Sequence, residues 1–89
     1  MIRESEKLFN KAIGEKIKSR RKELFLTQTQ VAEKLGVTFQ QVQKYEKGTN
    51  GCSAKRIDEL SKALRISILY FYANINLEVK NKQSKIIQI

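Results

Sequence analysis

The segment TQTQVAEKLGVTFQQVQKYEKG, residues 27–48, constrains the fold of this chain more than any other stretch. Thr27 and Thr38 are suited to capping helices, because a threonine hydroxyl accepts hydrogen bonds from the first free amides of a helix. Gly36 and Gly48 follow where each helix would end, and glycine adopts the left-handed conformation of a helix C-terminus without strain. The spacing therefore predicts two short helices joined by a sharp turn.

The side chains of this segment divide into an inward and an outward set on helices Gln28–Leu35 and Phe39–Lys47. The inward set has the spacing of buried helical faces and consists of Val31, Ala32, Leu35, Val42 and Tyr45. The outward arc of the second helix is mostly polar and consists of Phe39, Gln40, Gln43, Lys44 and Lys47. Ala32 and Gly36 have reason to be small, because the second helix crosses closely over the first and the chain reverses at the glycine.

The rest of the chain also favours helices, since it contains no proline and only four glycines. Asn10 is expected to cap a first helix, whose buried stripe consists of Ile13, Ile17, Arg20, Arg21 and Leu24. Ser53 and Ser67 are expected to cap two more helices, over 54–64 and 68–73. Residues 1–9 are then a lead-in, and residues 10–73 are predicted to form one small all-α domain.

Residues 74–89 follow a different pattern. Ile75, Leu77 and Val79 alternate with polar residues, which is the period of a β-strand. A polar stretch separates them from a second apolar run at 86–89. The tail is expected to form a hairpin, a strand paired with a second copy of the chain, or a disordered terminus. The three alternatives stay open.

The charge of the chain points to an anionic partner and not to catalysis. Lysine and arginine number 18 against 9 acidic residues, so the 89-residue chain carries +9 and attracts polyanions. With no histidine and the single Cys52, no nucleophile–base pair or metal set is expected, and no enzyme activity or cofactor is predicted. No signal-peptide core and no apolar run of about 20 residues is present, so we expect a cytoplasmic protein without a membrane role.

Two helices joined by a glycine-containing turn have the geometry that places a helix in the major groove of DNA. Residues 27–48 closely resemble the Cro/C1-type, or XRE-like, helix-turn-helix regulators, and the resemblance runs from about Asn10 through the helix at 68–73. It implies an all-α, five-helix, lambda-repressor-like DNA-binding domain with a short C-terminal extension. It also implies a motif at 28–47 and a homodimer on double-stranded DNA.

The outward arc of the second helix is expected to contact bases. The Gln40 amide suits a bidentate pair with adenine, and the resemblance also places base contact there. The resemblance assigns Lys44 to guanine or to a phosphate, and Gln43 flanks these two. Phe39 departs from the polar residue of many relatives; its ring is expected either to touch a thymine methyl or to pack against the preceding helix.

A second group of residues is expected to contact phosphates, which fixes register and affinity more than sequence preference. Gln28 begins a helix whose N-terminus favours an anion, and the resemblance assigns it both to the DNA backbone and to bracing the recognition helix. Thr38 is expected to add a contact through its hydroxyl, and the resemblance places Lys47, Thr49 and Asn50 along the next phosphates. Related sequences often carry arginine where this chain has Gly51, so one contact is expected to be missing.

The resemblance assigns a structural role to Arg21 and Glu46, which are expected to form an internal ion pair between the first and third helices. The function predicted from the sequence is a DNA-binding transcriptional regulator, most simply a repressor. Activation from an upstream site stays open. The alternative is an antitoxin-like or protein-interaction subunit that binds a partner protein through residues 75–89.

Overall fold

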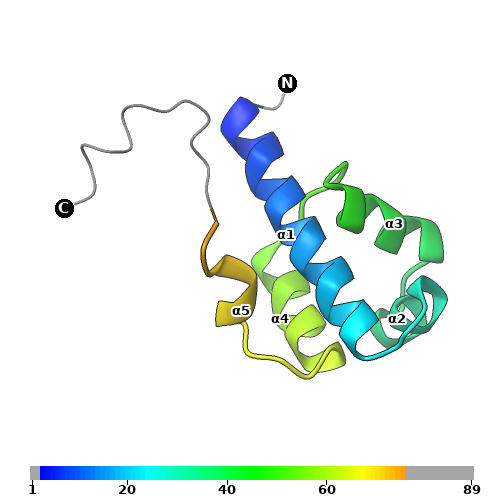
Figure 1. The fold of residues 1–89 in the computed structure, drawn as a ribbon. Helices are drawn as coiled ribbons and strands as arrows, with labels where there is room; N and C mark the ends of the chain where they lie inside the picture. The colour runs from blue at the N-terminus through cyan, green and yellow to red at the C-terminus, as the bar shows by residue number, and fades with distance from the viewer. Residues whose placement is uncertain (1–2, 76–89) are drawn as a thin grey trace.

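The computed structural model describes residues 3–75, which form five α-helices and no strand (Figure 1). The helices are α1 (Glu4–Glu23), α2 (Gln28–Leu35), α3 (Phe39–Lys47), α4 (Ala54–Ala63) and α5 (Leu69–Tyr72). The long α1 crosses the middle of the view, with α2 and α3 on one side and α5 on the other (Figure 1). This confirms the predicted all-α, five-helix architecture. The three alternatives predicted for the tail concern mainly residues 76–89, which lie outside the described residues.

Helices α2 and α3 have the bounds expected from the sequence, because their ends are determined locally. The Thr27 hydroxyl accepts a hydrogen bond from the Gln30 amide at 3.0 Å, and the Gln30 side chain accepts one from the Thr27 amide at 2.8 Å. The Thr38 hydroxyl accepts from the Gln41 amide at 3.1 Å. Gly36 and Gly48 are left-handed, with φ values of 74° and 78°.

Helix α1 begins at Glu4, so the predicted lead-in over residues 1–9 with a cap at Asn10 is wrong. The first turn carries two glutamates, which the positive end of a helix dipole stabilises. Further along, Phe9 is half-buried and its ring stacks on Tyr72 of α5, with 6.1 Å between centroids. Because this contact joins two ends of the domain, local sequence signals did not indicate it.

A single core lies where the helices meet. Its buried apolar residues come from every helix and from the residue after α4: Ile13, Ile17, Val31, Ala32, Val42, Tyr45, Ile57, Leu60, Leu64 and Phe71. The predicted inward faces of α1, α2 and α3 all contribute to this set, while Leu24 and Leu35 are only partly buried. The core therefore holds α2 and α3 in a fixed relation to each other.

Gly14 explains how closely α1 approaches α3. A Cβ atom at this position would lie 2.3 Å from the carbonyl oxygen of Tyr45 and 2.5 Å from that of Glu46. These are backbone atoms and have no freedom to rotate away. The absence of a side chain at Gly14 therefore lets the two helices pack closely.

Candidate nucleic-acid interface

The outward arc of α3 lies on the accessible surface. Gln40 and Lys44 are exposed and stand one helical turn apart, and Gln43 beside them is half-buried. Phe39 at the start of the helix keeps 38% of its surface exposed. Its ring is therefore partly covered by the protein, and its open part is available to a thymine methyl. The four expected base-contacting residues thus share one side of a short, rigid helix.

The expected phosphate-contacting residues border both ends of α3. Lys47 is exposed in the last turn, and Thr49 and Asn50 are exposed in the loop that follows. The amides of these two loop residues donate to the Lys44 carbonyl at 3.0 and 3.3 Å, which fixes the loop against the helix. Thr38 is also exposed, although its hydroxyl already accepts the capping hydrogen bond.

Glu46 points away from this surface and is buried, with 6% of its area exposed. The Arg21 guanidinium donates to both carboxylate oxygens, with Nε to Oε2 at 2.6 Å and Nη2 to Oε1 at 3.0 Å. Its remaining nitrogen, Nη1, donates to the Leu26 carbonyl at 2.9 Å. The structure therefore brings together the two residues that the resemblance assigned to an ion pair, and their contact joins α1 to α3.

Gln28 belongs to the same buried network. Its Nε2 atom donates to Glu46 Oε1 at 3.0 Å, so this side chain ties the start of α2 to α3. An amide nitrogen carries two hydrogens, and the second is not needed for this bond. This contact is the bracing of the recognition helix that the resemblance implied, and the phosphate role of Gln28 stays a prediction.

Sequence reasoning did not single out Arg56, in the first turn of α4. Its Nε atom donates to the Tyr45 hydroxyl at 3.0 Å, and its Nη1 atom donates to Glu59 at 2.7 Å. Arg56 lines a hollow of about 530 Å³ beside α3, together with Val37, Thr38, Gln41, Tyr45, Asn50 and Gly51. The only sequence signal was a cation three residues after the Ser53 cap, which is common at helix surfaces.

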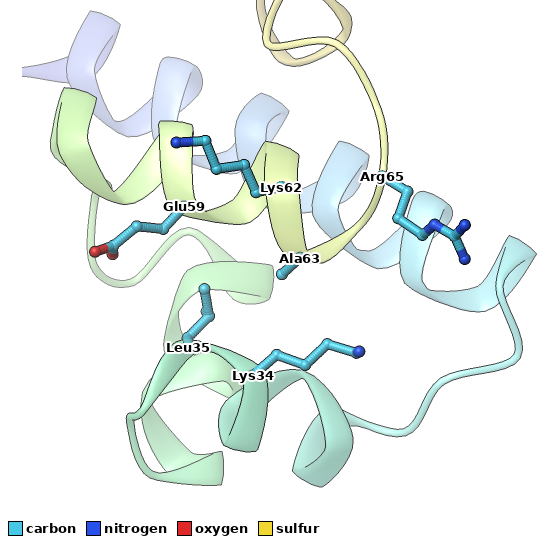
Figure 2. Close-up of a pocket in the computed structure, with 6 residues that line it drawn as sticks. All are labelled: Lys34, Leu35, Glu59, Lys62, Ala63 and Arg65. Atoms are coloured by element: carbon cyan, nitrogen blue, oxygen red, sulfur yellow. The ribbon is translucent and has the colours of Figure 1, made fainter.

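A larger hollow, of about 670 Å³, lies between the C-terminal ends of α2 and α4. Leu35 and Ala63 point toward each other across it, and charged side chains spread around its rim (Figure 2). Two of these charges are already paired, since Glu59 binds Arg56 at 2.7 Å and Lys62 binds Asp58 at 3.1 Å. The residues that line this hollow include no serine, threonine, cysteine, tyrosine or histidine.

The part of the chain that the structure describes contains no group of three or more histidine, cysteine, aspartate or glutamate residues able to hold a metal ion. None of its helices is both long and apolar enough to cross a membrane.

Cys52 is expected to react slowly with alkylating reagents. Burial raises the pKa of its thiol from 9.0 to about 11, against a smaller opposing effect of the Arg56 charge. At pH 8 the thiolate fraction is then about 100-fold below that of an ordinary cysteine, because each pKa unit is a factor of ten. Iodoacetamide labelling followed by mass spectrometry, with urea-unfolded protein as the control, measures this. Equal rates in the folded and unfolded protein would contradict the predicted burial.

The sequence matches a helix-turn-helix family model over residues 17–71. An uncharacterized HTH-type transcriptional regulator, y4wC, of Sinorhizobium fredii is 41% identical over 71 residues, which are 80% of this chain and 50% of that protein. An uncharacterized transcriptional regulator in the ATPase CF(0) region of Rhodospirillum rubrum is 43% identical over 63 residues, covering 71% of this chain and 58% of its own length. This chain thus spans about half the length of these relatives.

Two solved structures share the fold. The restriction-modification controller protein C.AhdI from Aeromonas hydrophila superposes with a TM-score of 0.67 at 24% identity, covering 70% of this chain and 94% of its own. The clp gene regulator ClgR from C. glutamicum superposes with a TM-score of 0.70 at 20% identity, covering 79% and 96%. On the family match, the sequence relatives and the arrangement of α2 and α3, the chain belongs to the Cro/C1-type helix-turn-helix family.

Proposed function

We propose that this protein is a sequence-specific DNA-binding transcriptional regulator, acting in the cytoplasm as a repressor on operator DNA. The observation that carries the proposal is the exposed arc of α3, held by a buried ion pair to α1 and by Gln28 from α2. A helix fixed in this way enters the major groove without losing conformational freedom on binding. The net charge of +9 supplies the attraction to the phosphate backbone.

Within this proposal, the residues of the surface have two kinds of task. Base contacts come from the arc itself, in the order Phe39, Gln40, Gln43 and Lys44. Phosphate contacts come from both ends of the helix pair, and comprise Gln28, Thr38, Lys47, Thr49 and Asn50. Arg21 and Glu46 touch no DNA and hold the frame. Repression then follows from occupancy, because a protein bound over a promoter excludes polymerase.

Lys44→Ala and Lys47→Ala test the two kinds of contact against each other. Both side chains are exposed lysines of α3, so each variant removes one charge from the same helix. We expect Lys44→Ala to change which base is preferred at one operator position, by about 1–3 kcal/mol, and Lys47→Ala to weaken binding to all sequences alike. Titration of fluorescent operator variants measures both effects. Equal losses of affinity for every sequence in Lys44→Ala would assign that lysine to the residues that contact phosphates.

The proposal includes a homodimer, and α5 offers the surface for it. Leu69 is 71% exposed, and Ile68 and Tyr72 beside it are also accessible. Residues 66–75 contain no charged side chain, so two copies of this strongly cationic chain repel each other least here. Helix α5 lies across α1 from α3 (Figure 1), and a two-fold contact through it leaves both copies of α3 free.

Leu69→Lys is expected to convert the dimer to a monomer. Losing two buried leucines, one from each copy, costs about 3–6 kcal/mol, which raises the dimer dissociation constant roughly 100-fold or more. Light scattering over a dilution series measures the mass. Glu33→Gln is the matched control, because it raises the net charge of the chain by the same one unit at an exposed position of α2. An unchanged dimer in Leu69→Lys would place the contact elsewhere, and a second polypeptide in the purified protein would favour the partner-binding alternative.

A further inference from the structure

We propose that Arg56 binds a DNA phosphate beside the recognition helix, in the hollow that it lines together with Thr38 and Asn50. The inference rests on the proposed DNA-binding function and extends it to α4, to which no DNA contact had been assigned. The Arg56 side chain has a fixed position. Two hydrogen bonds hold the guanidinium, from Nε to the Tyr45 hydroxyl at 3.0 Å and from Nη1 to Glu59 at 2.7 Å.

The Tyr45 ring also contributes to this position. The Cζ atom of Arg56 lies 5.9 Å from the centroid of the ring, within the range of a cation–π contact. Tyr45 belongs to α3 and its side chain is buried in the core of the domain, so its contacts with Arg56 connect α4 to the recognition helix. A guanidinium held on two sides loses little rotational freedom when it binds a further anion, unlike the free lysines of the surface.

Arg56 still has donors to offer. A guanidinium has five N–H groups, and within residues 3–75 its Nη2 atom donates to no protein acceptor. The side chain remains partly accessible, at 26%. Glu59 offsets part of the charge, but the same carboxylate also lies 3.8 Å from Lys55, so the three side chains together carry one net positive charge.

The residues that line the hollow point to a DNA phosphate as its ligand. Its lining includes Thr38 and Asn50, which border α3 at its two ends and are proposed phosphate contacts. Gly51 also lines it. Arg56 comes from α4, and neither Gln40 nor Lys44 lines the hollow, so a DNA group bound there would belong to the sugar-phosphate backbone and not to the bases that the arc contacts. An arginine fork matches the paired oxygens of a phosphate.

Arg56→Gln in the full chain tests this inference on duplex DNA carrying the preferred sequence. We expect the slope of log K against log salt concentration to become shallower by about 0.9 per copy of the protein bound, with equal weakening on matched and altered sequences. Arg56→Lys keeps the charge and is expected to keep the wild-type slope. Lys62→Gln is the matched control, because it removes the same charge from the far end of α4, and its slope is expected to stay unchanged.

The outcomes separate the inference from the function on which it rests. A wild-type slope in Arg56→Gln would overturn the phosphate contact, and so would the same change of slope in Lys62→Gln. If Arg56→Lys loses slope and thermal stability together with Arg56→Gln, Arg56 is only a support for Tyr45, and the inference fails. Wild-type protein that binds no duplex at all would instead contradict the proposed function itself.

Discussion

Glu46→Ala is expected to lower the free energy of unfolding by about 3–5 kcal/mol, enough to unfold much of a domain of this size. The reason is that the positive charge of Arg21 would stay buried without its carboxylate partner. Arg21 is mostly buried, with 11% of its side chain exposed, and without Glu46 its guanidinium keeps only the Leu26 carbonyl as a partner in that site. Gln28 loses its acceptor as well. Urea unfolding followed by circular dichroism measures the loss.

Glu23→Ala is the matched control for this experiment. Glu23 also pairs with an arginine of α1, Arg20 at 3.1 Å, but its side chain is 59% exposed. An exposed pair contributes at most about 1 kcal/mol, so this variant should unfold close to the wild-type midpoint. A Glu46→Ala protein as stable as Glu23→Ala would show that the buried network does not hold α1 to α3. Loss of DNA binding in Glu46→Ala, without loss of stability, would place Glu46 at the DNA surface.

Affinity for operator DNA is expected to fall about 100-fold between 50 and 200 mM salt. Two cations per copy, Lys47 and Arg56, neutralise four phosphates in a dimer, which gives a slope of about −3.6 in log K against log salt concentration. Over a fourfold change in salt this slope lowers the affinity by about two powers of ten. Lys44 would add to the slope if it contacts a phosphate in place of a base. Fluorescence anisotropy titrations at five or more salt concentrations (about 50–300 mM, the range in which counterion release dominates) measure it.

The control for the salt series is the same titration with Lys47→Ala. This variant should have a slope shallower by about 1.8, because both copies lose one phosphate contact. An affinity that does not change with salt would contradict a phosphate-based interface. A strong salt dependence that Lys47→Ala leaves intact would keep the interface but remove Lys47 from it.

The sequence predicted best what short stretches decide alone. The threonine caps and left-handed glycines set the bounds of α2 and α3, because each cap involves residues within three positions of each other. Helix α1 was predicted to begin too late, since Phe9 is covered by Tyr72 from the other end of the domain. The role of Gly14 could not be predicted for a similar reason: it depends on how near α3 passes, and the sequence of α1 does not show this.

The candidate site also contains some residues that the local sequence predicts and others whose role depends on distant contacts. The exposed arc of α3 follows from helical period and needed no tertiary information. Residues whose role depends on a distant partner were harder to assign. Gln28 braces Glu46 across 18 positions of sequence, and Arg56 reaches Tyr45 across 11. The resemblance to the family is the only reason that the Arg21–Glu46 pair, separated by 25 positions, and the bracing role of Gln28 were expected.

Selection of bound duplexes from random DNA, at one defined salt concentration, tests the central claim most directly. The account predicts enrichment of a palindrome whose two half-sites lie about 10–10.5 base pairs apart, centre to centre, because a homodimer places two copies of α3 in successive major grooves. It also predicts an adenine opposite Gln40 that Gln40→Ala no longer selects. Recovery of sequences no different from the starting pool, by a protein that binds them all with one affinity, would contradict the claim that α3 recognises a DNA sequence.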